Sequence, residues 1–482
     1  MRKKFAVNLI FLFVANLLVK PYWIFGVDRV VQNKVGPEVY GTYFAVFNFS
    51  FLFSIILDFG INNFNNRAVS RNNKRVGEYL ANLLLLKGAL SVVYLVGTFI
   101  AATLSGLGEM AMKMLWVLAV NQILLSVILY LRSNIAALQL FKTDSVISIL
   151  DRLLTIVFCS VLLFAAPFKQ SFNVLWFIYA QTAALFLTML IAFIVLAGRA
   201  TIKPVWWNNK FRRLILLKSA PFALLALLMG IYYRIDAVMI ERMLPNGAHE
   251  AGIYAASFRL LDAVNMFGYL FATLLLPLFA SMIRKRENLE PLVKFGAELM
   301  FAGSVTVAAL CYFFNRDIMQ LLYPDSDSYW WRIFGWLMLG FIPMSSVYIY
   351  GTLLTAHGSM KALNLIAVGG VVVNVALNLF LIPAYGALGA VIATLITQAV
   401  AALAHLLVAQ NVFGLKATPK EIARMAGFTT ICMAATYFFK TLPFHWAANM
   451  ALAGAVCMAL IPAMKIVPLH SLKALLGQKF AS

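Results

Sequence analysis

Charged residues are scarce in this chain. Asp, Glu, Lys and Arg make up only 12% of its 482 residues, whereas hydrophobic residues make up 63%. Average soluble proteins carry about 25% charged residues. No stretch is polar enough and long enough to form a separate soluble domain. The composition therefore argues against a soluble enzyme and favours a protein that spends its whole sequence crossing a membrane.

Cysteine and histidine are also scarce: the chain has four cysteines and five histidines. Cys159, Cys311, Cys432 and Cys457 all lie inside apolar segments, where a thiol serves as a small packing group. The histidines are scattered, and no cluster of His, Cys and acidic residues has the spacing of metal ligands. We therefore expect no metal site and no cofactor.

Hydrophobic stretches of membrane-spanning length recur about fourteen times, since a bilayer core takes roughly 20 helical residues to cross. Unpaired backbone is not tolerated in hydrocarbon, so each stretch predicts a helix. The sequence thus predicts an all-α polytopic membrane protein with about 14 transmembrane helices. The predicted spans are Phe5–Val27, Tyr40–Asn62, Tyr79–Leu104, Met112–Leu138, Ser145–Phe168, Phe172–Leu196, Leu214–Ile240, Gly252–Ala280, Leu292–Phe314, Trp330–Thr355, Ala362–Pro383, Ala387–Ala409, Ile422–Phe439 and Trp446–Val467.

The net charge of +21 would suggest a nucleic-acid partner in a soluble chain. Here the basic residues gather on one side of the predicted spans, and the inner segments hold roughly three times as many as the outer ones. This positive-inside asymmetry predicts that both termini are cytoplasmic, and it argues against a nucleic-acid partner. The outer segments hold only Arg29, Lys34, Lys113, Lys169, Arg242, Arg316, Arg332 and Lys440.

Two local patterns recur along the chain. VGPEVYGTYFAVFNF and NGAHEAGIYAASFRL align Gly41 with Gly252, an offset of 211 residues. A weaker pair, ALQLFKTDSVISIL and LLTAHGSMKALNLI, aligns at an offset of 217. Two matches at similar offsets predict two pseudo-symmetric six-helix lobes, a plan typical of transporters. The predicted domains are an N-terminal lobe at 1–200, a cytoplasmic connector at 201–213, a C-terminal lobe at 214–410, and helices 13 and 14 with a cytoplasmic tail at 411–482.

Polar side chains form lines along several predicted spans, because residues four apart share one helix face. Hydrogen bonds between packed spans would need similar residues. The concentration of polar and charged residues in spans one, two, seven and eight favours instead a wet central cavity. The lines are Asn16 and Lys20 in span one, Ser50, Ser54, Asp58 and Asn62 in span two, Gln122, Ser126, Tyr130 and Asn134 in span four, and Tyr254, Asp262, Asn265 and Tyr269 in span eight.

Ionised residues inside spans cost at least a few kcal/mol, so they face a cavity, a partner or the interface. We expect Lys87, Lys218 and Lys294, near cytoplasmic ends, to extend their ammonium groups to the interface. Lys and Arg suit phosphate, while aromatic rings and amides suit sugars. The predicted substrate-binding residues are Lys20, Arg234, Arg259, Asn16, Asn265 and Tyr254, and the candidate acids for coupling to a proton or sodium gradient are Asp58, Asp236 and Asp262.

Three stretches in order carry a resemblance to a known family. They are Gly36–Arg71, with GPEVYGTYFAVFNF, Tyr233–Ala263, with an Arg-x-Asp element before a Gly-x-Tyr helix start, and Val371–Gln398, with an Asn-rich span and an Ile-Pro-x-Tyr-Gly turn. With them the chain resembles the polysaccharide transporter family, the O-antigen and exopolysaccharide flippases of the multidrug/oligosaccharidyl-lipid/polysaccharide exporter superfamily.

The resemblance implies a flippase that moves an undecaprenyl-diphosphate-linked oligosaccharide repeat unit outward by alternating access in the bacterial cytoplasmic membrane. It assigns Arg234 and Asp236 to a cavity-facing helix. A polysaccharide polymerase is a candidate partner, and lipopolysaccharide or O-antigen biosynthesis is the expected pathway. Two alternatives stay open within transport: a drug or metabolite antiporter and a lipid II-type flippase of the same fold. A membrane-embedded glycan polymerase or glycosyltransferase would use paired carboxylates, for which Asp325 and Asp327 are the only outer pair.

Overall fold

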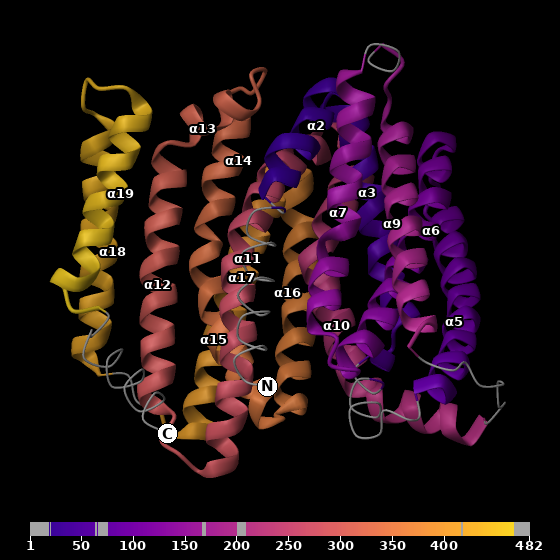
Figure 1. The fold of residues 1–482 in the computed structure, drawn as a ribbon. Helices are drawn as coiled ribbons and strands as arrows, with labels where there is room; N and C mark the ends of the chain where they lie inside the picture. Colours follow the sequence, from indigo (N-terminus) through magenta and orange to yellow (C-terminus); the bar gives the residue numbers. More distant parts are fainter. Residues whose placement is uncertain are drawn as a thin grey trace. The chain divides into compact units, whose positions relative to one another are not determined.

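The computed structural model describes residues 19, 21–62, 65, 76–165, 170–199, 209–415 and 418–466. Within those ranges all regular structure is helical, and 13 helices are long and apolar enough to cross a membrane (Figure 1). The predicted all-α transmembrane fold is thus confirmed. The predicted first span, Phe5–Val27, lies mostly outside the described residues. The other 13 predicted spans each coincide with one of the 13 helical spans.

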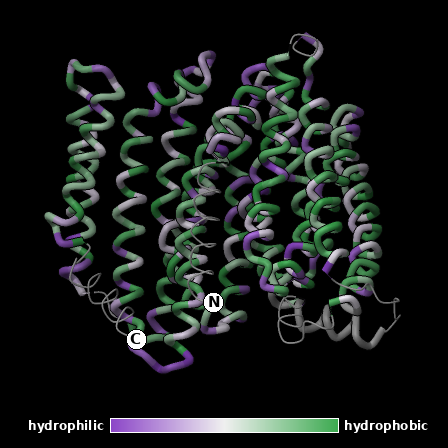
Figure 2. Tube along the Cα trace, in the orientation of Figure 1, coloured by the Kyte–Doolittle hydropathy of each residue, from purple (hydrophilic) through white to green (hydrophobic). Residues whose placement is uncertain are grey.

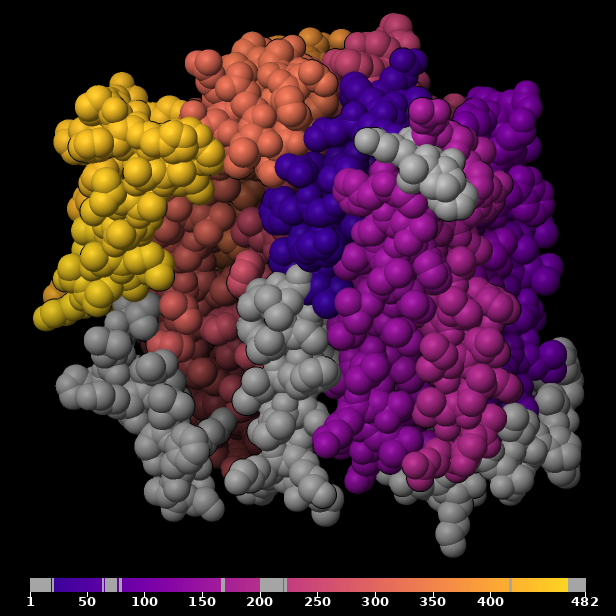
Figure 3. Space-filling view, turned by 45° about the horizontal axis from the view of Figure 1, so that its top comes forward, coloured from indigo at the N-terminus to yellow at the C-terminus, as the bar shows by residue number. Residues whose placement is uncertain are grey.

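The chain folds as two compact units, and the first comprises Met1–Gly252. In it α3 packs on α10 and α6, and α9 packs on α6 and α7. The side chains of α7 and α9 fill the space between these two helices in the space-filling view (Figure 3). Its elements are η1 (Trp23–Asp28), α2 (Arg29–Val35), α3 (Pro37–Phe53), η2 (Ser54–Leu57), α5 (Val76–Leu104), α6 (Glu109–Ala137), α7 (Phe141–Phe164), α9 (Val174–Ala197) and α10 (Asn209–Met243).

The second unit comprises Ile253–Ser482 and contains most of α11. The α16–α17 hairpin, the α12–α15 pair and the α18–α19 hairpin are its main packing elements. The predicted connector at 201–213 lies mostly outside the described residues and stays a prediction. The elements are α11 (Gly247–Lys285), α12 (Glu290–Phe313), α13 (Asn315–Leu322), α14 (Ser328–Leu339), α15 (Phe341–His357), α16 (Met360–Tyr385), α17 (Ala387–Phe413), α18 (Pro419–Lys440) and α19 (Trp446–Ala463).

Hydrophobic residues run along the helices, and hydrophilic residues gather toward the helix ends (Figure 2). Large apolar side chains on the helix surfaces are exposed, including Leu104, Leu365 and Phe380. In water such a surface would be an aggregation hazard. On helices of this length it is the surface expected to face lipid.

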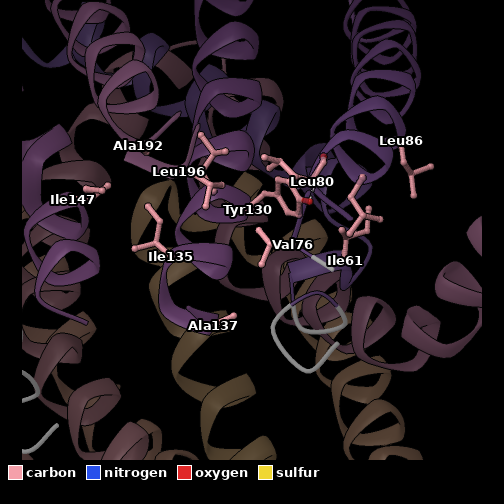
Figure 4. Packing of buried hydrophobic residues seen from close by; sticks show 12 residues of the cluster. Ile61, Val76, Leu80, Leu86, Tyr130, Ile135, Ala137, Ile147, Ala192 and Leu196 are labelled. Atoms are coloured by element: carbon pink, nitrogen blue, oxygen red, sulfur yellow. Dashed lines mark hydrogen bonds between the residues drawn. The ribbon is translucent and has the colours of Figure 1, made fainter. Parts of the chain in front are cut away.

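The interior of the first unit holds a compact cluster of buried apolar residues around Tyr130 (Figure 4). Leu80 and Ile61 pack there with Ile135, and the Tyr130 hydroxyl donates a hydrogen bond to the carbonyl oxygen of Leu80 at 3.4 Å. The cluster joins α5, α6, α7 and α9, and it fixes the position of the fourth predicted span, which carries Gln122 and Ser126.

The α18–α19 hairpin is joined to α12 and α13 by ion pairs at both ends of α18. Arg424 pairs with the buried Glu298, and Lys440 pairs with Asp317. Lys294, which is expected to extend toward the interface, lies 2.9 Å from Glu421 at the start of α18. Asp317 belongs to the short helix α13.

Labelling at the two ends of α11 tests the predicted orientation of the chain. Asn246 and Glu287 flank this helix and are exposed. The native cysteines give little background, because three are buried and Cys311 is partly buried. We expect Asn246→Cys to react with an impermeant maleimide added to intact cells and Glu287→Cys to react only after lysis. Position 247 is unsuitable, because a Cβ there would lie 2.2 Å from the carbonyl oxygen of Glu241. Reaction of Glu287→Cys in intact cells would contradict the positive-inside assignment.

Candidate functional site

The second predicted span is interrupted part-way along its length. After α3 the chain forms the 3₁₀ turn η2 and then a turn at residues 58–60, before one further helical segment starts at Ile61. Phe59 and Gly60 have positive φ values of 42° and 76°. The sequence predicted one continuous helix over Tyr40–Asn62, which was wrong at this point. Non-helical backbone at membrane depth occurs where it is buried in protein or lines a polar cavity.

Lys87 pairs with Asp58, the acidic residue at the interruption of the second span. Its ammonium nitrogen lies 3.3 Å from Oδ1 of Asp58, and its side chain is only 2% exposed. The same nitrogen donates to the carbonyl oxygen of Leu57 at 2.9 Å and to Oγ of Ser126 at 2.7 Å. The expectation that Lys87 extends to the interface was therefore wrong. Lys87 instead contacts Ser126 on α6 and Asp58 in the interrupted part of the second span.

A cavity of about 250 Å³ lies beside this pair. Ser54, Asp58 and Asn62 line it from the interrupted span, and Gln122 and Ser126 line it from α6. Thus polar residues of the second and fourth predicted spans meet at one cavity. The apolar wall consists of Phe51, Leu52, Ile55, Leu57, Leu125, Leu129, Ala226, Leu227 and Gly230.

The remaining members of both polar lines have other roles. Ser50 is fully buried and shares a 2.7 Å hydrogen bond with the Tyr94 hydroxyl. Tyr130 belongs to the apolar cluster, and Asn134 is fully buried and donates to the carbonyl oxygen of Tyr130 at 3.0 Å. These residues hold α3, α5 and α6 together, as expected for polar groups between packed membrane helices.

Arg234 packs against one wall residue of this cavity. Its guanidinium carbon is 5.5 Å from the centre of the Phe51 ring, within cation–π range. Phe51 and Gly230 both line the cavity, and Gly230 lies four residues before Arg234 on the same face of α10. The predicted coupling acid Asp58 therefore lines the cavity, and the predicted binding residue Arg234 packs against Phe51 in its wall.

The other predicted site residues fall in different places. Asp236 is buried on α10. On α11, Tyr254 is buried and stacks on Phe258, whereas Arg259, Asp262 and Asn265 are partly buried and follow one another at three-residue spacing. Asn16 and Lys20 lie outside the described residues. Nothing in the structure tests the proposed roles of this set.

Asp327, one member of the outer acidic pair, caps a helix. The carboxylate of Asp327 accepts hydrogen bonds from the backbone amides of Tyr329 and Trp330 at 2.9 and 3.1 Å, so it caps the N-terminus of α14. Capping accounts for an acidic residue at this position without any reaction.

Solved structures share this helical fold. The chain superposes on "Lipid II flippase MurJ, inward closed conformation" with a TM-score of 0.72 and 14% identity, covering 94% of this chain and 98% of that one. It superposes on an inward-facing multidrug resistance MATE family transporter of the MOP superfamily with a TM-score of 0.63 and 16% identity, covering 83% and 94%.

The family follows from the sequence match. Residues 5–283 match the polysaccharide biosynthesis protein family, so the chain belongs to that family. It is also 27% identical over 204 residues to the Lipid III flippases of Escherichia coli (strain K12) and Shigella flexneri. The match covers 41% of this chain and 47% of each relative, so the chain spans about half the length of these curated relatives. The resemblance stated from the sequence is confirmed.

Proposed function

We propose that this protein is a flippase that moves an undecaprenyl-diphosphate-linked oligosaccharide repeat unit from the inner to the outer leaflet by alternating access. The observation that carries the proposal is the cavity beside the interrupted span. Five polar side chains line part of its wall, and the Arg234 guanidinium packs against Phe51, another residue of that wall. The family match and the two flippases among the similar proteins support a lipid-linked substrate. The bacterial cytoplasmic membrane, cytoplasmic termini and a function in O-antigen or lipopolysaccharide assembly are parts of the same proposal.

Different residues of the site suit the diphosphate and the sugar of such a substrate. Arg234 offers a planar set of donors for the diphosphate, and guanidinium groups bind phosphate oxygens in pairs. The cavity wall offers amides and hydroxyls from Asn62, Gln122 and Ser126, which suit sugar hydroxyl groups. Its volume of about 250 Å³ falls below the roughly 300–1,000 Å³ of pockets that enclose a drug-sized ligand. It therefore fits one sugar residue better than a whole repeat unit.

Further members of the proposed site lie elsewhere in the chain. Arg259 and Asn265 on α11 are proposed substrate contacts of the second unit, together with Tyr254. Lys20 and Asn16 are proposed contacts in the first predicted span. Asp58 remains the best-placed coupling acid, because it borders the cavity and is about one-third exposed.

Two other functions make different demands on this site. A drug or metabolite antiporter is favoured by the MATE neighbour. A cavity for lipophilic cations, however, would be expected to carry unpaired acids, whereas Asp58 is paired with Lys87 here. A membrane-embedded polymerase would need paired catalytic carboxylates. The capping role of Asp327 removes the reason for assigning one to the only outer acidic pair.

Deletion of the gene tests the proposal directly. We expect lipid-linked glycan to accumulate on the inner leaflet, and wild-type protein supplied in trans to restore its export. Everted membrane vesicles carrying the protein should move labelled undecaprenyl-diphosphate glycan into a glycosidase-protected compartment. Altered drug resistance without glycan accumulation would favour the antiporter. Loss of glycan polymer with normal transfer across the membrane would favour a polymerase.

Gln122 provides a residue-level test of the cavity. We expect Gln122→Leu to slow vesicle transport by about tenfold, because one hydrogen bond to a sugar is worth roughly 1–1.5 kcal/mol. The matched control is Asn121→Leu, since Asn121 is equally buried on the same helix but does not line the cavity. Equal transport rates for the two variants would contradict the assignment of the cavity to substrate.

A further inference from the structure

The ammonium group of Lys87 lies in a cage of three oxygens. They are Oγ of Ser126 at 2.7 Å, the carbonyl oxygen of Leu57 at 2.9 Å and Oδ1 of Asp58 at 3.3 Å. An ammonium has three N–H donors, and each oxygen here can accept one. The side chain is only 2% exposed, so the charge is held away from bulk solvent.

The interrupted span creates this cage. In a continuous helix the backbone amide of Ile61 would donate to the carbonyl oxygen of Leu57. Here that amide donates to the carbonyl oxygen of Asp58 at 2.8 Å, which leaves the Leu57 oxygen turned toward Lys87 and Ser126. Carbonyls released by unwound membrane helices coordinate Na⁺ or protons in transporters. With a single carboxylate, this set suits a monovalent cation.

The geometry differs from that of an ordinary ion pair. Lys294 contacts two carboxylates, Glu421 at 2.9 Å and Glu290 at 3.1 Å. The nitrogen of Lys87 is closer to the neutral oxygens of Ser126 and Leu57 than to its only carboxylate. Neutral oxygens arranged around a charge are typical of a cation-coordination shell, whereas a simple pair needs the carboxylate alone.

We infer that Lys87 is a tethered cation that permanently occupies a monovalent metal-ion site in the first unit. Removing its ammonium group opens the site, and Na⁺ then binds to the Leu57, Asp58 and Ser126 oxygens. The wild-type unit takes no Na⁺ at this position, because the side chain already fills it. This inference concerns ion binding, so it stands or falls independently of whether the protein transports a glycolipid.

The experiment compares Na⁺ with choline. Wild-type protein, Lys87→Ala and Lys294→Ala are purified in nanodiscs, and thermal unfolding and ²²Na⁺ binding are measured in NaCl and in choline chloride of equal ionic strength. We expect Na⁺ to raise the Tm of Lys87→Ala by several degrees, because a ligand that binds only the folded state stabilises it. We expect the wild-type protein and Lys294→Ala to unfold at the same temperature in both salts. Lys294→Ala is the matched control, since it removes an ammonium held by carboxylates alone.

A second variant locates the ion. Lys87→Ala combined with Asp58→Asn should fold in choline chloride, because neither unpaired charge remains, and should lose the response to Na⁺. A retained response in this double variant would place the ion elsewhere and overturn the inference. So would Na⁺ stabilising the wild-type protein as much as Lys87→Ala. Failure to recover Lys87→Ala in either salt would overturn it as well, since Na⁺ must be able to replace the missing ammonium.

Discussion

Replacing Arg234 with alanine is expected to abolish export of lipid-linked glycan while leaving the protein in the membrane. Arg234 lies beside the cavity with its guanidinium carbon 5.5 Å from the Phe51 ring centre. A hydrogen bond to a charged group contributes roughly 1.5–3 kcal/mol, so losing the contact to a diphosphate slows transport by up to about a hundredfold. Export is measured as inner-leaflet accumulation of the glycolipid, and protein level by immunoblot of purified membranes.

Two further variants test whether Arg234 binds substrate. Arg234→Lys should restore export only partly, because lysine lacks the planar fork of donors. Arg242→Ala is the control on the same helix: Arg242 pairs with Glu241 and donates to the carbonyl oxygens of Ser105 and Gly106, away from the cavity. It should keep export near the wild-type rate.

The competing explanation is that Arg234 only neutralises Asp236. Residues two apart on a helix point to different faces, and Asp236 is buried while Arg234 packs against Phe51 of the cavity wall. If neutralisation were the role, Arg234→Ala combined with Asp236→Ala should regain the export that the single variant lost. Recovery in that double variant would make Arg234 a structural residue.

The transmembrane helices were predictable because their signal is local. A run of about 20 apolar residues has one stable form in hydrocarbon, so each such run predicted a helix whatever the rest of the chain does. The line Gln122–Ser126 was predictable for the same reason, since residues four apart share a face of a continuous helix. Ser54, Asp58 and Asn62 do not lie on one continuous helix, so the spacing alone does not explain why they meet. Both sets of residues reach the cavity.

The features that were missed depend on partners distant in sequence. Lys87 near a predicted span end is equally compatible with an interfacial position, and only the fold places it against Asp58 and Ser126. The interruption after Phe53 had one local signal, the Asp58–Phe59–Gly60 sequence in the middle of an apolar run. Phe59 adopts a left-handed backbone conformation that non-glycine residues rarely adopt, and its residue type does not predict this conformation.

Gly41 and Gly252, the two residues that the internal repeat aligns, lie against each other's helices within the first unit. A Cβ at Gly41 would lie 1.8 Å from the carbonyl oxygen of Ala248, and a Cβ at Gly252 would lie 1.9 Å from that of Pro37. The repeat offset of 211 residues also aligns Pro37 with Ala248. Each glycine thus meets the oxygen that precedes its counterpart by four residues, which is the reciprocity of a two-fold contact.

This reciprocity predicts that the smallest side chain is not tolerated at either position. Gly41→Ala and Gly252→Ala each force two backbones apart, because the obstructing atoms are carbonyl oxygens that no rotamer change can move. The side chain of Gln32 already donates to the carbonyl oxygen of Gly252 at 2.9 Å, so separation also breaks a buried hydrogen bond. We expect each variant to lose at least the roughly 1–3 kcal/mol that overpacking costs, measured as thermal stability in detergent and as yield of folded protein. Gly97→Ala on α5 is the control, because a Cβ there has no atom within 4 Å, and it should match the wild-type protein. Unchanged stability in Gly41→Ala or Gly252→Ala would mean that the helix starts do not cross in direct backbone contact.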